Sequence, residues 1–408
     1  MPEHIVAIDA ARLRNRVTEL RLRQWWIAEQ LGIDRKTVAR WLGGQVRTMR
    51  ADNAAALAEV LRGTVADFER RDGDADLAGP DDQRAAGLAL AAGTLLERLG
   101  PVGEWDVAER LIRASAVPDL PLHVLAALYN QLCVACWRQS RMTEAESHNQ
   151  RAMALVERCG DLALRADALA SRANLAHWRG ECAQAQATYR EALALRAHIA
   201  PARHAGLRNN LGASLYECGE FAAGRIELEA SLDEFRLVGT PMQLSIARTH
   251  LALLDLRVDD VAGARVHADW SRRHAQEGGY QRGLAMVELL RAEIAGREGR
   301  FDDARQSLHD GLARFASLGI DEGLNHEIAA RVHRLLGGTD AARAAVAAGL
   351  AVSAGFPLQA AHLHFEAACI EHAAGDVPAG RAAARRACDG FEACGASTWA
   401  GAARRLAD

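Results

Sequence analysis

The sequence contains no apolar run near 18 residues, which excludes a membrane-spanning helix at the level of sequence. Its first residues, MPEHIVAIDAARLRNR, lack the apolar core of a secretion signal, so we expect a cytoplasmic protein. Aromatic residues make up only 5% of the chain, whereas alanine is abundant, a composition that suits closely packed helices. Lysine is nearly absent, since Lys36 is the only one.

Motifs for catalysis and for metal binding are also missing. We find no Walker loop, no GxSxG and no HExxH, and therefore expect no enzyme activity and no cofactor. The eight cysteines are scattered, and Cys133-Val-Ala-Cys136 is the only CxxC. It has no second CxxC and no nearby histidine pair, so we predict reduced, buried thiols and no metal site.

The charge is unevenly distributed along the chain. Residues 1–62 carry eleven Arg or Lys against seven Asp or Glu, a balance of +4, and because the whole chain has a net charge of −4 the remainder totals −8. A basic segment joined to an acidic body suits a DNA-binding module attached to a domain with another role.

The stretch Gln24 to Leu42, QWWIAEQLGIDRKTVARWL, predicts two short helices around a tight turn. Gly32 supplies a positive φ at the end of the first helix, and Asp34 caps the second. On that second helix Arg35, Lys36 and Arg40 form a basic face, placed where a recognition helix reaches base edges in the major groove. The alternative is an ordinary solvated charged face.

Residues 9–68 resemble the helix-turn-helix domain of the Cro and phage-repressor class, the xenobiotic-response-element family. The matching residues are Gln24, Ala28, Gly32, Val38 and Trp41. The resemblance implies a five-helix domain, and from the residues we predict that Asp52 caps a fourth helix running to about Arg62. The resemblance also implies that Arg35, Lys36 and Arg40 read bases, while Gln24 and Thr37 contact phosphate. Trp25 and Trp26 depart from the family pattern, and a dimer contact, a contact with the rest of the chain and unusual packing all remain open.

From residue 83 onward the pattern is helix, short turn, helix, repeated. The turn position recurs every 37 to 40 residues, at Gly103, Ser140, Gly180, Gly219, Asp259, Gly299, Gly337 and Gly375. Three columns, seven residues before, five after and twelve after each turn, hold small residues in 23 of 24 positions; Leu96 is the exception. This pattern resembles the tetratricopeptide repeat family, with a period longer than the usual ~34 residues.

We therefore predict an all-α protein: a helix-turn-helix domain at 1–68, an acidic linker at 69–82, a solenoid of about eight helical hairpins at 83–395 and a capping helix at 396–408. A solenoid presents a concave groove lined by the first helix of each repeat. Positions ten, six and three residues before the turns predict a set of groove residues that could contact a peptide or partner protein: Asn130, Trp137, Asn174, His177, Asn209 and Tyr216. The three asparagines could clamp a peptide backbone, because an amide both donates and accepts; the alternative is that they merely face water. Later repeats add Glu293, Arg331 and Arg334, which could meet charged ligand ends.

A Cro-like head followed by tetratricopeptide repeats is similar to the peptide-responsive regulators of Gram-positive quorum sensing, the Rap, NprR, PlcR and PrgX group. The resemblance implies a homodimeric transcriptional regulator that binds an inverted-repeat operator in double-stranded DNA and senses a signal peptide or partner protein in its groove. The alternative hypothesis is an interaction scaffold, a partner in a defence or toxin system, whose helix-turn-helix serves autoregulation.

Overall fold

The computed structural model describes residues 5–20, 22, 24–43, 45–46, 48–69, 80–92 and 104–408. The chain divides into two compact units, Met1–Gly79 and Pro80–Asp408. Most of the predicted linker, residues 70–79, lies outside the described residues, as do Leu96 and Gly103 of the first predicted repeat. Within the described ranges, no helix has the length and apolar character that crossing a bilayer requires.

The first unit is a small helical domain with a two-stranded sheet. Its elements are β1 (Ile5–Ala7), α1 (Ala10–Glu19), α2 (Gln24–Leu31), α3 (Arg35–Leu42), β2 (Thr48–Arg50), α4 (Ala51–Val60) and the 3-10 turn η1 (Val65–Asp67). The strands pair antiparallel, with Val6 opposite Met49. Side chains from α2, α3, α4 and the segment after η1 share one core, among them Ile27, Val38, Leu57 and Phe68.

The turn between α2 and α3 has the predicted chemistry. Gly32 has φ +62°, and the Asp34 carboxylate accepts a hydrogen bond from the Lys36 backbone N–H at 3.0 Å. The prediction that Asp52 caps the fourth helix is wrong: Arg50 occupies the N-cap position of α4, without a capping hydrogen bond from its side chain, and Asp52 lies inside the first turn. The physical reason is the strand β2, which delivers the chain directly into the helix.

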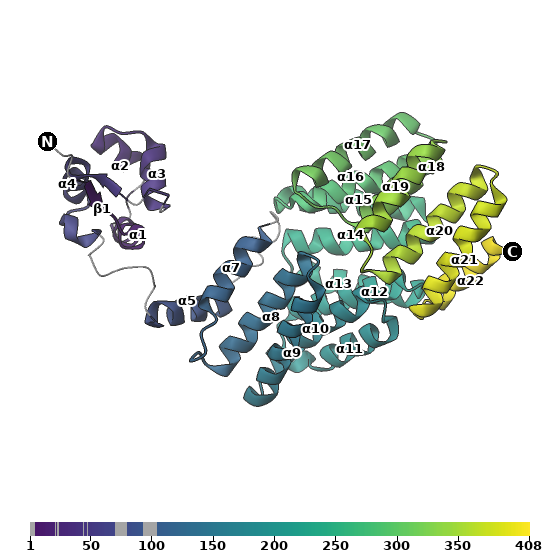
Figure 1. Cartoon of the computed structure of the whole chain (residues 1–408), viewed down its shortest axis with the longest axis horizontal. Coiled ribbons are helices and arrows are strands. Elements are labelled where there is room, and N and C mark those ends of the chain that lie inside the picture. Colours follow the sequence, from purple (N-terminus) through teal and green to yellow (C-terminus); the bar gives the residue numbers. More distant parts are fainter. Residues whose placement is uncertain are drawn as a thin grey trace. The chain divides into compact units, whose positions relative to one another are not determined.

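The second unit consists of helices in antiparallel pairs (Figure 1). They are α5 (Pro80–Ala92), α7 (Trp105–Ser115), α8 (Leu122–Arg138), α9 (Met142–Cys159), α10 (Leu162–Trp178), α11 (Cys182–Ala194), α12 (Pro201–Glu217), α13 (Phe221–Val238), α14 (Pro241–Arg257), α15 (Val261–Glu277), α16 (Gln281–Arg297), α17 (Phe301–Ser317), α18 (Gly323–Leu335), α19 (Thr339–Val352), α20 (Pro357–Ala373), α21 (Val377–Ala393) and α22 (Ser397–Ala407), with a 3-10 turn η3 (Arg196–His198) after α11. The prediction of an all-α fold with a helical solenoid is confirmed.

The repeat register is visible in the backbone. All seven described turn positions have positive φ, including the two that are not glycine, Ser140 (φ 60°) and Asp259 (φ 63°). Every described residue of the three small-residue columns is buried. In the fourth pair, for example, a Cβ on Gly212 would lie 3.0 Å from the Gly224 carbonyl oxygen. Small residues at these positions therefore allow the paired helices to approach closely.

The last repeats return to the middle of the array. In α20, His362 Nε2 lies 3.0 Å from the carbonyl oxygen of Glu217, the last residue of α12. The rings of Phe221 in α13 and Trp399 in α22 are in edge contact at 5.5 Å, and Cys394 packs against Gly180. The terminal helix thus covers the end of the array and also joins it to the third and fourth pairs.

Candidate functional site

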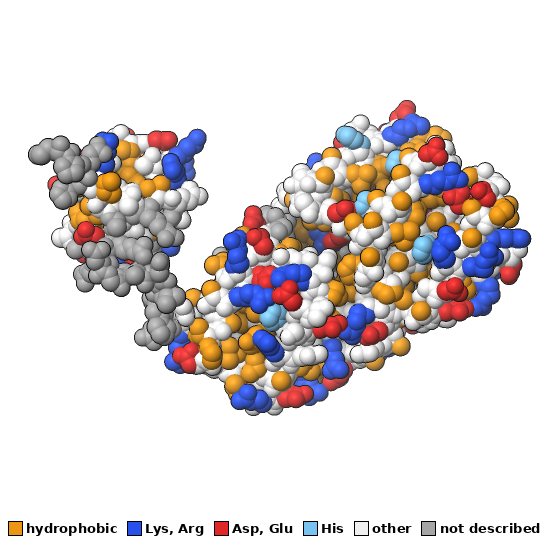
Figure 2. All heavy atoms as spheres, viewed as in Figure 1, with side chains coloured by type: hydrophobic (Ala, Val, Ile, Leu, Met, Phe, Trp, Pro, Cys, Tyr) orange, Lys and Arg blue, Asp and Glu red, His pale blue; other side chains and the backbone are white. Residues whose placement is uncertain are grey.

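The exposed face of α3 is basic. Arg35, Lys36 and Arg40 are all exposed, and none forms an ion pair or a side-chain hydrogen bond with a described residue. Lys and Arg side chains are visible over this part of the first unit (Figure 2). Asp34 caps the helix start on the same side. The geometry leaves three unneutralised cations available to an anionic partner.

The other predicted DNA contacts and the two tryptophans near this face differ in how far they are buried. Gln24 is exposed at the first residue of α2, and Thr37 of α3 is half-buried. Trp26 packs partly into the core of the domain, whereas Trp25 is 55% exposed. Packing therefore accounts for Trp26 only.

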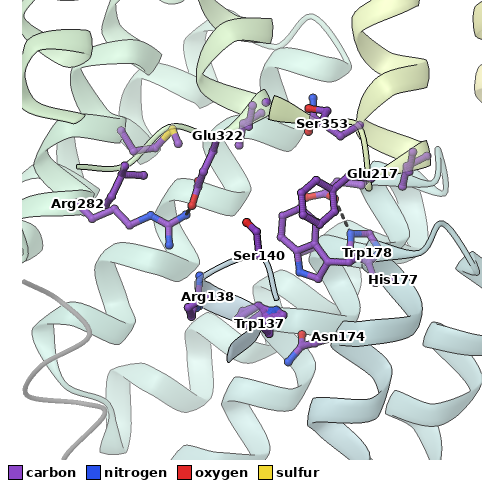
Figure 3. A pocket seen from close by; sticks show the side chains of 18 of the residues that line it. Trp137, Arg138, Ser140, Asn174, His177, Trp178, Glu217, Arg282, Glu322 and Ser353 are labelled. Atoms are coloured by element: carbon purple, nitrogen blue, oxygen red, sulfur yellow. Dashed lines mark hydrogen bonds and ion pairs between the residues drawn. The ribbon is translucent and has the colours of Figure 1, made fainter. Parts of the chain in front are cut away.

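A cavity of about 710 Å³ lies inside the second unit, lined by residues from α7 to α20. One wall is aromatic: Trp178 has its ring in edge contact with Phe356 at 5.0 Å and with Trp137 at 6.2 Å (Figure 3). The return of α20 to the middle of the array brings Phe356 to this wall. The wall thus offers a large apolar surface to a bound molecule.

Four of the six predicted groove residues line the cavity: Trp137, Asn174, His177 and Tyr216. Asn130 does not, and its side-chain oxygen accepts from the Ser171 hydroxyl at 2.7 Å. Asn209 is 3% exposed and bonded to His250, while the next residue, Asn210, lines the cavity. One residue along a helix rotates a side chain by about 100°. The structure therefore does not bring the three predicted asparagines together.

Hydrogen bonds hold the polar lining residues in place. The Tyr189 hydroxyl donates to Asn174 Oδ1 at 2.5 Å. His177 lies between the Glu217 carboxylate (2.7 Å) and the Ser214 hydroxyl (3.1 Å). Burial raises the pKa of Glu217, but His177 and the histidines around it lower that pKa more, and its net shift is downward. Glu217 is consequently a carboxylate at neutral pH.

Several cavity residues carried no signal in the repeat pattern. Arg282 of α16 binds the Glu322 carboxylate at 2.6 Å, and Arg257 of α14 binds Glu327 at 2.5 Å. Arg138, the last residue of α8, stacks its guanidinium over the Trp137 ring, with 3.9 Å between the guanidinium carbon and the ring centroid. Helix ends and an inter-repeat loop supply Arg138, Arg257, Arg282 and Glu322, whereas the predicted positions lay within helices. Glu327 differs, because it lies inside α18, ten residues before the Gly337 turn, at a register position of the predicted groove.

Glu293, Arg331 and Arg334, predicted to meet charged ligand ends, do not line the cavity. Arg331 is 5% exposed and donates to three buried carboxylates at 2.7–2.8 Å, those of Glu293, Glu327 and Glu366. Arg334 lies 3.5 Å from Glu366. Burial raises the pKa of Glu327, but Arg257 and Arg331 lower that pKa by more, so that it lies well below its usual range. These residues form an internal ion cluster between helices.

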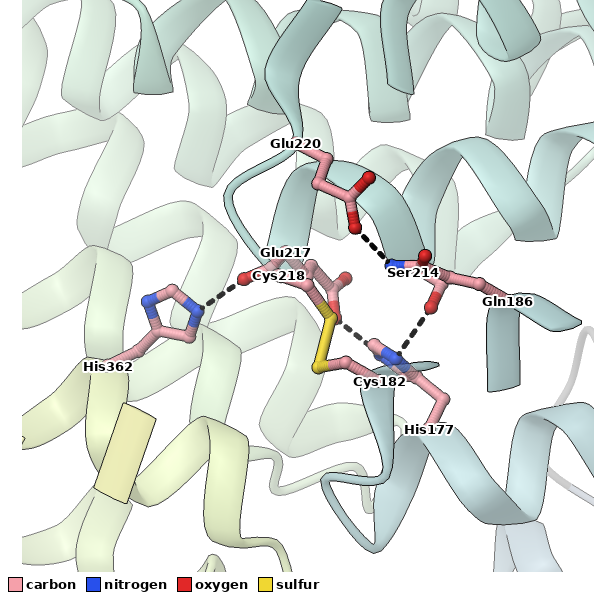
Figure 4. The surroundings of a disulfide bond; sticks show 8 residues. All are labelled: His177, Cys182, Gln186, Ser214, Glu217, Cys218, Glu220 and His362. Atoms are coloured by element: carbon pink, nitrogen blue, oxygen red, sulfur yellow. Dashed lines mark hydrogen bonds and ion pairs between the residues drawn. A yellow bond between two sulfur atoms is a disulfide. The ribbon is translucent and has the colours of Figure 1, made fainter. Parts of the chain in front are cut away.

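The structure corrects the expectation of eight reduced cysteines. Cys182, the first residue of α11, and Cys218, directly after α12, form a disulfide with a Cα–Cα distance of 6.4 Å (Figure 4). Sequence reasoning missed the pair because the two residues belong to neighbouring repeats and occupy different register positions. Cys133 and Cys136 are buried free thiols, as predicted.

One cluster of potential metal ligands occurs in the described residues. Cys136, Glu144 and His148 bring one ligand atom each to within 4.8 Å of the others. Glu144, however, already pairs with Arg113 (2.9 Å) and Arg141 (3.0 Å). Two guanidinium groups occupy the surroundings in which a metal cation would need negative charge, so the cluster is better described as an ion-pair network.

Solved structures share the fold of the chain. A Rap protein complexed with Competence and Sporulation Factor matches with a TM-score of 0.64 at 13% identity, over 95% of this chain and 99% of that one. The apo form of RapI matches with a TM-score of 0.51 at 12% identity, over 65% and 97%. PlcR from Bacillus thuringiensis, in complex with the peptide PapR7 and DNA, reaches a TM-score of only 0.40 at 11% identity, over 65% of this chain and 94% of that one. No model of a known protein family matches, and no curated protein does. The likeness to the Rap structures shows a common helical fold.

Proposed function

We propose that the protein is a DNA-binding transcriptional regulator, without enzyme activity, whose repeat solenoid senses a peptide or protein ligand in its central cavity. The observation that carries the DNA-binding role is the set of three exposed, unpaired cations on α3, directly after the Asp34-capped turn. Cations at the start of such a helix can donate to base edges and phosphates in the major groove.

The sensing role rests on the cavity. It is large enough for several residues of a peptide and combines an aromatic wall with amide groups and charges. A Rap protein of the same fold was solved in complex with Competence and Sporulation Factor, which supports a signalling ligand for this fold. The solenoid would also join two copies, so that paired recognition helices lie about 34–36 Å apart and read an inverted repeat.

Selection of bound duplexes from a random DNA library tests the DNA-binding role without knowledge of the operator. We expect enrichment of an inverted repeat and an affinity that falls steeply with salt. On the selected duplex, Arg35→Ala or Lys36→Ala is expected to cost about 1–3 kcal/mol if the contact is base-specific. Arg158→Ala, which removes an exposed arginine from α9, serves as the control with equal charge change. Equal affinity in all variants, or no enriched sequence, rejects the proposal.

A further inference from the structure

We infer that the cavity takes a ligand with a carboxylate joined to an apolar body, and that Arg138 binds the carboxylate. The inference rests on the proposed sensing function, in which the ligand is a short peptide. The carboxylate is then either the C terminus of the peptide or an Asp or Glu side chain.

Arg138 is the one arginine of the described cavity lining that forms no ion pair or side-chain hydrogen bond with a carboxylate. The other two arginines of the lining pair with carboxylates of the lining, as Arg282–Glu322 and Arg257–Glu327, and Glu217 accepts a hydrogen bond from His177. Asp106 and Asp321 each pair with a side chain that does not line the cavity. Arg138 is therefore the lining arginine whose guanidinium is left for a carboxylate of the ligand.

The environment of Arg138 prepares its guanidinium for an anion. The flat face of the group is covered by Trp137 at 3.9 Å and approached by Trp105 at 5.7 Å. Stacking uses the face of a guanidinium and leaves the N–H groups at its edge unbonded. Arg138 is exposed and points into the open space of the cavity, beside the Ser140 hydroxyl (Figure 3). A carboxylate can accept two parallel hydrogen bonds from such an edge.

The rest of the lining determines what is attached to the carboxylate. The rings of Trp178 and Phe356 continue the aromatic wall from Trp137, and this wall suits an aliphatic or aromatic side chain. Asn174 and Asn210 also face the cavity, and their amides can pair with peptide groups. A single unpaired arginine matches the one charge of a carboxylate better than the two charges of a phosphate dianion, because Arg257 and Arg282 are already paired. A carboxylate on an apolar peptide matches the unpaired arginine, the aromatic wall and the two amides.

The test uses the full chain and four pools of N-acetylated random pentapeptides in equilibrium dialysis with mass-spectrometric readout. The pools contain or lack Asp and Glu, and end in a free carboxylate or an amide. The amidated pool without Asp and Glu is the neutral pool. We expect the pool whose carboxylate binds Arg138 to be retained about tenfold or more above the neutral pool. The acid-terminated pool without Asp and Glu, and the amidated pool with them, show which source of the carboxylate is used.

Variants locate the contact. Arg138→Gln is expected to reduce retention to the level of the neutral pool, Arg138→Lys to keep a preference for the acid forms, and Arg158→Gln to leave it unchanged. Equal retention of neutral and acid pools, unaffected by Arg138→Gln, overturns the inference and leaves peptide sensing intact.

Absence of binding by every pool rejects peptide sensing, and a small probe then decides the inference. Indole-3-propionate retained by the wild type, but not by Arg138→Gln, would support the carboxylate site with a non-peptide ligand. Retention of indole-3-propionate equal to that of its amide, or of neither compound, would overturn it.

Discussion

His362 Nε2 lies 3.0 Å from the carbonyl oxygen of Glu217, although 145 residues separate the two in the chain. The imidazole must carry its proton on Nε2 to donate to a carbonyl. Its Nδ1 is buried without a hydrogen-bond partner in the described part of the molecule. The ring is enclosed by Phe391 and Trp399, each at 4.9 Å. A neutral histidine therefore helps to join the last repeats to the middle of the array and close the cavity.

Acidification is expected to weaken this junction. Burial lowers the pKa of His362 from 6.5 to about 4. Between these values the unfolded chain binds a proton that the native state excludes, so stability is complete above pH 6.5 and is lost as the pH falls toward 4. The contribution of His362 amounts to a loss of about 2 kcal/mol at pH 5. Urea unfolding at about pH 7.5 and about pH 5 measures it.

His362→Gln provides the comparison, because glutamine offers an N–H donor to the carbonyl and does not titrate. Its stability is expected to depend less on pH than that of the wild type. Some dependence should remain, since His250 and His267 also have their pKa values lowered to about 4 by burial. An unchanged pH dependence in His362→Gln would show that this histidine is protonated without cost.

The Arg331 cluster yields a second prediction. Arg331→Met leaves the buried carboxylates of Glu293, Glu327 and Glu366 without their shared cation, and is expected to cost about 3–5 kcal/mol at neutral pH. Arg305→Met breaks only an exposed ion pair with Asp302 and should cost less than about 1 kcal/mol. Urea midpoints of the two variants give the comparison.

The pH dependence of Arg331→Met adds a check. In the wild type the pKa values of Glu293 and Glu327 are lowered, so their contribution is present above the ordinary glutamate pKa of 4.5 and is lost as the pH falls below it. Without Arg331 those pKa values rise, although Glu293 keeps Arg297 and Glu327 keeps Arg257, and protonation removes the negative charge that has lost its partner. The difference between variant and wild type should therefore shrink from pH 7 to pH 4; a constant difference would mean that the carboxylates find other partners.

The repeat architecture could be predicted because every repeat imposes the same local requirements on its residues. A positive φ favours glycine at the turn, and close helix contact requires small residues at a constant distance from it, so Gly180, Ala173 and Ala185 belong to one readable pattern. The turn between α2 and α3 was readable for the same reason, since Gly32 and Asp34 act on their own neighbourhood.

The closed cavity was not predictable in this way. His362 and Glu217 meet only because the array curves enough to bring distant repeats together, and no local pattern encodes that curvature. Asn209 and Asn210 are adjacent in the helix, and a degenerate repeat does not define the inner face to within one residue. The register placed Glu293 and Arg331 in the groove, where they could meet charged ligand ends, because sequence does not show that their partners lie on other helices.

The Cys182–Cys218 disulfide can be tested by counting the free thiols. Of the eight cysteines six are free, so alkylation of the unfolded, unreduced protein should add six labels, and prior reduction should raise the number to eight. Reduction is also expected to lower the free energy of unfolding by about 3–4 kcal/mol, the entropic effect of opening a loop of this length. Eight labels without reduction would show that the two thiols are not joined.

Helix α12 allows a test of close packing with two glycines. A Cβ at Gly212 would lie 2.7 Å from Leu228 Cγ and 3.0 Å from the Gly224 carbonyl oxygen, whereas at Gly206 it would meet nothing within 4 Å. Gly212→Ala is therefore expected to destabilise by about 1–3 kcal/mol through overpacking. Gly206→Ala should stabilise by about 0.5–1 kcal/mol, because alanine loses less backbone entropy in a helix. Thermal unfolding of both variants distinguishes packing from helix propensity, which would give both substitutions the same sign. If Gly212→Ala also stabilises, the fourth pair tolerates a wider separation of its helices, and the small-residue columns do not set the spacing there.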